Sequence, residues 1–283
     1  MLTRESLADA LPCQRRVAVR WLAAGVLLPA GVGWAGGAQA QIGLSSAINH
    51  AGWFRALSQR MAKAYCQQYL RVLSPAAGDV MEQVRKMAQT GAGELARGLP
   101  SGQWPADVAR NLEEVRKQFA LLNQLTAVPA TGTAAVVAAA EQADRTLLIA
   151  QTVTESIERM APVPSARLVN LAGRQRMLSQ RLAKNYFLVA ARVDSKLIQN
   201  QLVSDAADFR QAMQTLAAAP VSTPAIRAEL ELAEQQWMFF DMALRRPSDD
   251  KALNNVATTS ERLLEVMDRL TGRYEAALRE VMG

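Results

Sequence analysis

A glycine followed three residues later by an arginine occurs twice in this chain, at Gly52 and Arg55 and again at Gly173 and Arg176. Residues three apart on a helix lie on the same face, and arginine presents a planar fork of N–H donors that matches a planar oxyanion. A glycine inside a helix costs about 0.8–1 kcal/mol relative to alanine. Its recurrence therefore indicates a close approach by another helix or by a ligand, and these four residues are the candidate anion-binding residues.

The two glycine–arginine pairs belong to a longer repeat. The segments INHAGWFRALSQRMAKAY, from Ile48, and VNLAGRQRMLSQRLAKNY, from Val169, are 121 residues apart and agree at 11 of 18 positions. A helical period places the large apolar residues of the first copy on one side, as a core stripe, and mixes small and long polar residues on the other. Two such helices packed face to face would bring Arg55 and Arg176 together, and an anion between them would offset their repulsion.

A packing helix preserved by duplication is the alternative explanation of the repeat. Its arginines would then pair with nearby carboxylates or extend into solvent. From spacing alone this alternative is the more frequent case. The anion-binding interpretation itself leaves two geometries open. The two copies can pair within one chain, which we favour, or each copy can meet its twin across a homodimer.

Helix-breaking residues divide the chain into segments that would position these side chains. Pro and Gly cluster with Ser, Thr or Asp at the segment ends, as at helix termini, and strand-like alternation is missing from the sequence. The predicted helices are 42–73, 77–98, 105–127, 132–160, 164–192, 195–218, 223–245 and 248–281. Short connections favour antiparallel neighbours. We therefore predict an all-α fold of two tandem antiparallel four-helix bundles, 41–160 and 161–283.

The first 40 residues have the pattern of a targeting segment. Arg15, Arg16 and Arg20 precede the apolar stretch WLAAGVLLPAGVGWAGG, and Ala-Gln-Ala ends at Ala40. This order of regions is typical of a cleaved secretory signal peptide, which predicts a periplasmic protein. An uncleaved inner-membrane anchor is the alternative, and general and twin-arginine export both remain open. Cys66 would then be the only cysteine, so an intramolecular disulfide is not expected.

Composition excludes several function classes. The formal net charge is +6, yet Lys and Arg do not cluster with aromatic residues as in a nucleic-acid interface. The single histidine, His50, excludes multi-histidine metal sites and histidine-based catalytic dyads. A glycine-rich phosphate loop is missing as well. We therefore expect a protein that is not an enzyme and that has neither a cofactor nor a metal ion. A b-type haem held by His50 and a Met is the alternative, although Met in a helical bundle usually fills the core.

The repeated segments resemble the PilJ-type N-terminal domain of methyl-accepting transducers and the signature helix of NarX-type nitrate/nitrite sensor kinases, with its Asn-x-Ala-Gly-x-x-Arg core. The resemblance implies a periplasmic four-helix sensor bundle in which two copies of this helix meet across a dimer and hold one nitrate or nitrite between them. It assigns the anion to Gly52, Arg55, Gly173 and Arg176. The motif's Asn would support the helix start, and the motif-supporting residues are Asn49, Gln59, Asn170 and Gln180.

The chain also departs from these families. Trp53 and Phe54 in the first copy correspond to Arg174 and Gln175 in the second, so the two copies are not equivalent. Family receptors continue into a second membrane span, a HAMP linker and a kinase or chemotaxis module. The expectation here is a sensor domain without an output module, reporting through a membrane sensor or an anion transporter. The alternative is a periplasmic adaptor or structural bundle that binds a membrane receptor or a pilus or chemotaxis component without a small ligand.

Overall fold

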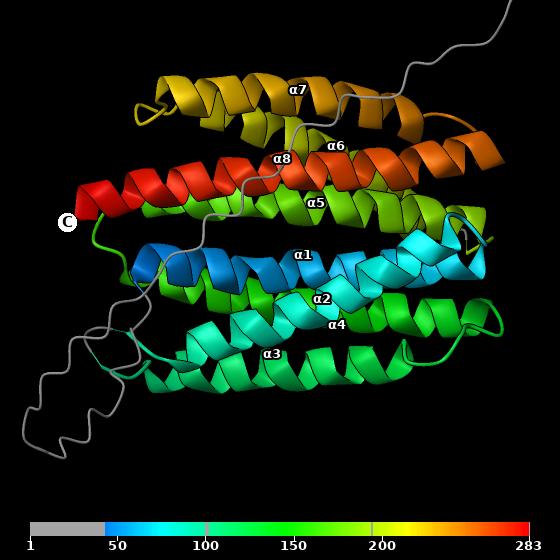
Figure 1. The fold of residues 1–283 in the computed structure, drawn as a ribbon, viewed down its shortest axis with the longest axis horizontal. Helices are drawn as coiled ribbons and strands as arrows, with labels where there is room; N and C mark the ends of the chain where they lie inside the picture. The colour runs from blue at the N-terminus through cyan, green and yellow to red at the C-terminus, as the bar shows by residue number, and fades with distance from the viewer. Residues whose placement is uncertain (1–42, 100–101, 194, 283) are drawn as a thin grey trace, which may run out of the picture. The chain divides into compact units, whose positions relative to one another are not determined.

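The computed structural model describes residues 43–99, 102–193 and 195–282, and this part of the chain is helical (Figure 1). The helices are α1 (Leu44–Tyr69), α2 (Ser74–Ala96), α3 (Ala106–Leu125), α4 (Thr133–Met160), α5 (Ala166–Ala190), α6 (Lys196–Ala217), α7 (Pro224–Leu244) and α8 (Asp250–Met282). An all-α fold is therefore confirmed. The predicted signal peptide, residues 1–40, lies outside the described residues.

The end of the first helix differs most from its predicted position. Residues to 73 were expected in that helix, but α1 ends at Tyr69. Arg71 and Leu73 adopt φ angles of 59° and 46°, in the left-handed region that non-glycine residues rarely enter. The chain therefore turns sharply before α2, which has Pro75 in its first turn.

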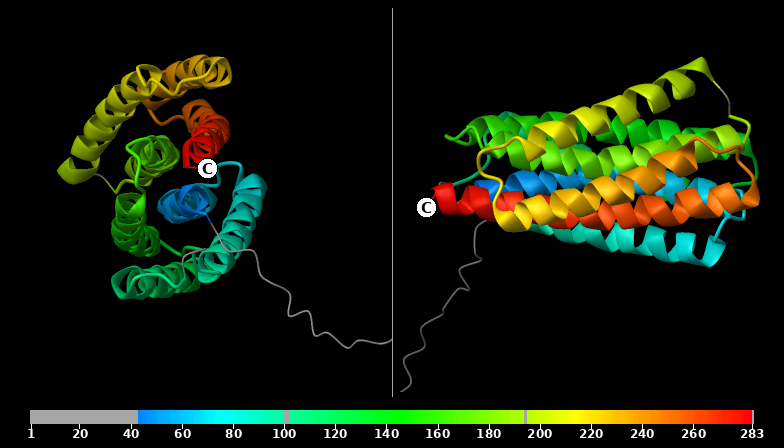
Figure 2. Two further views of the ribbon diagram at one scale, coloured as in Figure 1. Left: turned by 90° about the vertical axis from the view of Figure 1, so that its left-hand side faces the viewer. Right: turned by 90° about the horizontal axis from the view of Figure 1, so that it is seen from above.

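The two repeated helices, α1 and α5, pack directly against each other. In the first half (α1–α4), α1 also contacts α2 and α4, and α3 packs on α4. In the second half (α5–α8), α5 also contacts α6 and α8, and α7 packs on α8. The end-on view of Figure 2 shows α1 and α5 enclosed by the other helices. Each half thus repeats one arrangement around its motif helix.

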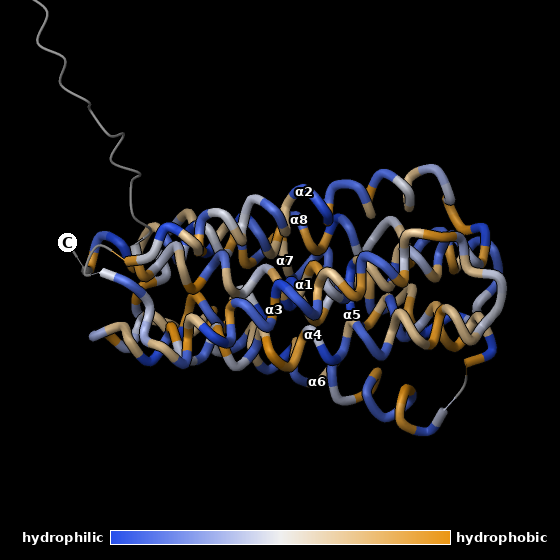
Figure 3. The backbone as a smooth tube through the Cα atoms, turned by 90° about the horizontal axis from the view of Figure 1, so that it is seen from below, coloured by the Kyte–Doolittle hydropathy of each residue, from blue (hydrophilic) through white to orange (hydrophobic). Residues whose placement is uncertain are grey.

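The polar side of the motif helix is as buried as its apolar side. Residues 54–67 of α1 are all buried, and so are most residues from 175 to 188 of α5. Hydrophilic and hydrophobic segments alternate along the helices in Figure 3, and one continuous apolar core runs through both halves. The residues that the structure describes form one compact unit. That 41–160 and 161–283 are separate domains stays a prediction.

Candidate anion-binding site

The arginines of the two motif copies lie beside each other where α1 meets α5. Both side chains are fully buried. A Cβ atom added to Gly52 would lie 2.9 Å from Arg55 Nη2 and 3.6 Å from Arg176 Nη2. One added to Gly173 would lie 3.1 Å from Arg176 Nη2 and 3.4 Å from Arg55 Nη2. Both guanidinium groups therefore lie over both glycines, within one chain.

Arg55 is bonded only to neutral acceptors. Its Nη1 donates to Gln151 Oε1 at 2.6 Å and to Asn170 Oδ1 at 2.7 Å. Longer bonds of 3.4 Å run from Nη2 to the Asn170 carbonyl oxygen and from Nε to the Gly52 carbonyl oxygen. Burial, and then the positive charge of Arg176, lowers the pKa of Arg55 to about 9. At neutral pH the first-half guanidinium is therefore a buried cation that forms no ion pair with a described carboxylate.

Arg176 has a carboxylate partner and an aromatic cover. Its Nη1 donates to Asp268 Oδ1 of α8 at 2.7 Å, and its Nη2 donates to the Asn49 carbonyl oxygen at 3.3 Å. The centroid of the Trp53 ring lies 4.3 Å from Arg176 Cζ, within the range of a cation–π interaction. Burial lowers the pKa of Arg176, and Asp268 acts in the opposite direction. The second-half guanidinium is thus compensated by the protein itself.

The partners of the two motif helices follow a second internal correspondence. The partners of Arg55 and Arg176 include Gln151 of α4 and Asp268 of α8, which are 117 residues apart. The same offset relates Glu158 to Glu275. The last helices of the two halves, α4 and α8, therefore contact the motif helices through equivalent positions. The residue type is the same for the glutamates but differs for the partners of the arginines.

The motif asparagines hold the two halves together. Asn49 Nδ2 donates to Glu275 Oε2 of α8 at 2.5 Å, and Asn170 Nδ2 donates to Glu158 Oε2 of α4. Both bonds cross from one half to the other. The prediction that these asparagines support the helix start was wrong, because Gly43 and Ser165 are the N-caps. Each asparagine lies about one turn or more inside its helix, where its side chain can reach the neighbouring bundle.

The motif glutamines connect each motif helix to the last helix of its own half. Gln59 Nε2 donates to the Ala143 carbonyl oxygen at 3.1 Å, and Gln180 Nε2 donates to the Ser260 carbonyl oxygen at 3.0 Å. Each lies four residues beyond its arginine in sequence, about one helical turn. The structure therefore gives both glutamines the same packing contact.

The motif lysines form ion pairs that cross between the halves. Lys63 of α1 pairs with Glu261 of α8, and Lys184 of α5 pairs with Asp144 of α4 at 2.6 Å. Arg60 also pairs with Glu261. Burial raises the pKa of Glu261, but Lys63 and Arg60 outweigh it and lower that pKa to about 2. The first-half lysine thus shares its carboxylate with a second cation.

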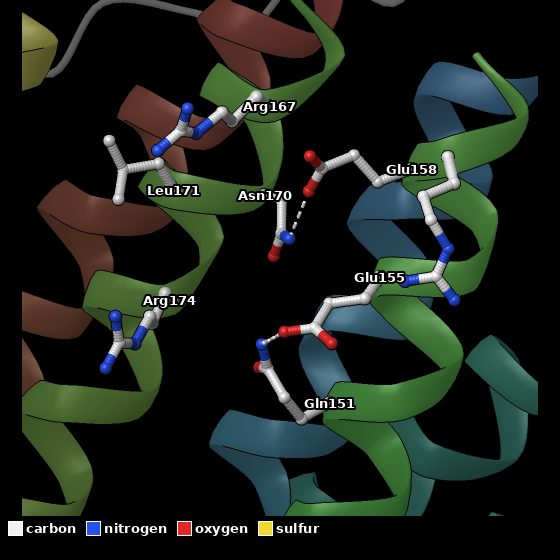
Figure 4. A pocket seen from close by; sticks show the side chains of 8 residues that line it. Gln151, Glu155, Glu158, Arg167, Asn170, Leu171 and Arg174 are labelled. Atoms are coloured by element: carbon white, nitrogen blue, oxygen red, sulfur yellow. Dashed lines mark hydrogen bonds between the residues drawn. The ribbon is translucent and has the colours of Figure 1, made fainter.

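A pocket of about 350 Å³ opens between α4 and α5 beside Arg55 (Figure 4). Its lining residues are Gln151, Glu155, Glu158, Arg159, Arg167, Asn170, Leu171 and Arg174. Gln151 and Asn170, the two acceptors of Arg55 Nη1, belong to this lining. The buried guanidinium is therefore separated from the pocket by two neutral side chains.

Two residues of the site, Gln151 and Asp268, were missed in the sequence. Around them α4 and α8 share few identities, among them Thr154 with Thr271 and Glu158 with Glu275. Alignment of the two helices at the offset of 117 residues would have been the signal. Within the described residues, no group of three or more His, Cys, Asp or Glu could hold a metal ion. No helix there is long and apolar enough to cross a membrane.

Comparison with known proteins agrees with the internal repeat. The family model described as type IV pili methyl-accepting chemotaxis transducer N-terminus (PilJ) matches residues 39–152 and 163–264, more than half of the chain. No curated protein and no solved structure matches. The likeness to NarX-type kinases stays a prediction. The family is one of non-catalytic sensor domains of chemotaxis transducers, and this chain belongs to it, with two copies of the domain in tandem.

Proposed function

We propose that this protein is a periplasmic sensor that binds a small planar oxyanion, such as nitrate or nitrite, at Arg55 and Arg176 between α1 and α5. The observation that carries the proposal is the state of Arg55, which is fully buried and bonded only to neutral acceptors. A buried charge without a counter-ion is costly. An anion bound beside the two guanidinium groups offsets that cost, and the four residues Gly52, Arg55, Gly173 and Arg176 form its surroundings.

The expected affinity is moderate. A hydrogen bond to a charged group contributes about 1.5–3 kcal/mol net. Two or three such bonds to one small anion, less the costs of desolvation and ordering, correspond to a Kd between roughly micromolar and millimolar. A sensor with this affinity responds to changes in the concentration of a common ion.

Calorimetry of the purified protein tests the proposal. Nitrate and nitrite should each bind with one anion per chain, and chloride at the same ionic strength serves as the control. Arg55→Gln should abolish the binding heat, because Gln carries no charge to offset the anion. Arg110→Gln, on the exposed surface of α3, is the matched control and should bind as the wild type does. Absence of binding by the wild-type protein at millimolar nitrate and nitrite would refute the function.

The proposed sensor passes its signal to another protein. An anion between α1 and α5 would act on the contact through which the two halves pack, so binding can change the relative position of those halves. We propose a membrane sensor or an anion transporter as the partner. Crosslinking in intact cells should recover such a membrane protein in a nitrate-dependent manner. Recovery of the same crosslinked species with Arg55→Gln, regardless of nitrate, would contradict this coupling.

Export is the remaining part of the proposal. The signal-like pattern ending at Ala40 predicts a mature N-terminus at Gln41. Mass spectrometry of the protein from the periplasmic fraction should find that N-terminus. An intact N-terminal segment in the membrane fraction would favour the inner-membrane anchor instead.

An adaptor that binds a protein partner without a small ligand is the second candidate function. Met238, Phe239 and Met242 of α7 are more than half exposed, and exposed apolar groups of this kind mark protein contacts. A pocket of about 340 Å³ beside them includes Arg246 and Arg262. Phe239→Ser with Met242→Ser should release a partner under this function and leave nitrate binding unchanged.

A further inference from the structure

We propose that the anion site is one-sided: Asp268 and Trp53 hold Arg176 as a fixed cation, and Arg55 alone supplies the charge that the ligand neutralises. The ligand reaches Arg55 from the pocket between α4 and α5, and it is a planar monoanion. This inference rests on the proposed function and defines the charge and the entry side of its ligand.

The first argument is the balance of charge at the equivalent positions of α4 and α8. Asp268 pairs with Arg176 at 2.7 Å and cancels its charge. Gln151 occupies the equivalent position toward Arg55 and cancels nothing. The two arginines and one aspartate together leave a single positive charge inside the α1–α5 contact. One monoanion neutralises that charge, whereas a dianion would leave a buried negative charge, which is unfavourable.

The second argument is the cover over each guanidinium. The Trp53 ring lies over Arg176, with its centroid 4.3 Å from Cζ. The residue equivalent to Trp53 in the second copy is Arg174, which is ion-paired with Asp208 at 2.8 Å. Figure 4 shows the Arg174 side chain directed away from Gln151. An aromatic ring therefore covers Arg176, whereas the corresponding residue of the second copy, Arg174, lines the pocket beside Arg55 and offers no ring to cover it.

The third argument is the wall between Arg55 and the pocket. Gln151 Oε1 and Asn170 Oδ1 both accept from Arg55 Nη1, and both residues line the pocket. Asn170 is also held by Glu158, whereas the amide of Gln151 donates to Glu155 in an exposed hydrogen bond. Gln151 is therefore the less restrained of the two, so its rotation opens the path to Arg55 and an oxygen of the ligand takes the place of Oε1.

The charges around the pocket match a small anion held deep inside. Arg159 and Arg167 line it and attract anions, and Glu155 and Glu158 oppose them. Both glutamates already accept hydrogen bonds from side-chain amides, Glu155 from Gln151 and Glu158 from Asn170. Arg159 and Arg167 therefore supply the attraction toward the pocket, and Arg55 selects for a single negative charge.

A reciprocal exchange of the two acceptors tests the inference. Gln151→Asp gives Arg55 the internal counter-ion that Arg176 has, and it should weaken nitrate binding by about 10- to 100-fold, since a charge-assisted bond is lost. The same variant should melt at a higher temperature than the wild type in nitrate-free buffer. Asp268→Asn frees Arg176, so it should bind nitrate more tightly and begin to bind sulfate. Thr152→Asp adds the same charge at an exposed position next to Gln151 and should bind nitrate within about 3-fold of wild type.

Calorimetry with nitrate, nitrite, acetate and sulfate on all four proteins separates the outcomes. Wild-type binding of acetate in preference to nitrate identifies the monoanion as a carboxylate, and the one-sided site still stands. Unchanged nitrate affinity in Gln151→Asp, or tight sulfate binding by the wild type, overturns the one-sided site and leaves the proposed function intact. A wild-type protein that binds none of the monoanions overturns both. Gln151→Glu repeats the measurement if Gln151→Asp fails to fold.

Discussion

The surroundings of Arg55 and Arg176 differ although the helices that carry them have the same motif. Arg176 has a carboxylate at 2.7 Å and an indole ring over its face, whereas Arg55 has two amide oxygens and a neighbouring pocket. The motif lysines behave differently, because each has a carboxylate from the opposite half. Contacts that are alike in both halves hold the bundles together. The contact that differs, at Arg55, is where we propose that a ligand takes the place of a protein partner.

The largest losses of stability are expected at the ion pairs of Lys63 and Lys184, where the two halves are most alike. Glu261→Gln leaves the fully buried Lys63 without its carboxylate and should lower the free energy of unfolding by about 3 kcal/mol. Asp144→Asn should lower it by about 2 kcal/mol, because the Asp144 side chain is 44% exposed and water already screens its pair with Lys184. Urea denaturation measures both. Equal losses, or a greater loss for Asp144→Asn, would contradict this ranking.

Acid should weaken the pair of Glu261 with Lys63. The pKa of Glu261 is about 2 in the folded chain, against an ordinary value of 4.5. Because its folded pKa is depressed, the pair contributes its stability fully above pH 4.5 and loses it as the pH falls toward 2. The loss from this group is at most about 3 kcal/mol. Denaturation curves between pH 6 and pH 3 should therefore fall less steeply with pH for Glu261→Gln than for the wild type. Parallel curves would show that Glu261 is not the main acid-sensitive group.

Removal of the positive charge should lower the stability of the protein at Arg176 but not at Arg55. Arg176→Met leaves Asp268 without its partner and should lower the free energy of unfolding by about 1–3 kcal/mol, reduced because Asp268 is 45% exposed. Arg55→Met removes a buried cation that has only neutral acceptors, so its stability should change by less than about 1 kcal/mol or increase. Thermal melting without added anions compares the two. A greater loss for Arg55→Met would show that Gln151 and Asn170 compensate Arg55 as well as Asp268 compensates Arg176.

The smallest changes in stability are expected for substitution of the two motif glycines. Alanine in a helix interior gains about 1 kcal/mol over glycine, but its Cβ would lie 2.9 Å from Arg55 Nη2 in Gly52→Ala. In Gly173→Ala the Cβ would lie 3.1 Å from Arg176 Nη2, which Asp268 holds in place. Both variants should stay within about 1 kcal/mol of wild-type stability, and Gly52→Ala should weaken nitrate binding more by displacing Arg55. Stronger nitrate binding in either variant would contradict the close approach as the reason for glycine.

Much of the architecture was predictable from the sequence. Proline and glycine clusters divided the chain into helices close to those observed, because these residues end helices by local geometry that does not depend on the fold. The 121-residue repeat also identified Gly52, Arg55, Gly173 and Arg176 as a set, since motif identity survives in the helix that both halves bury. The role of these residues in anion binding stays a prediction.

Only the tertiary structure decided how the two copies differ. Gln151 and Asp268 come from helices that follow their arginines by more than 90 residues in the chain, and few identities link those helices. The placement of Trp53 on the arginine of the other copy likewise depends on how α1 and α5 pack. The sequence of a motif determines which charged residues its helix carries. The helices packed around it determine which charge has a counter-ion, because that depends on distance in space and on exclusion of water.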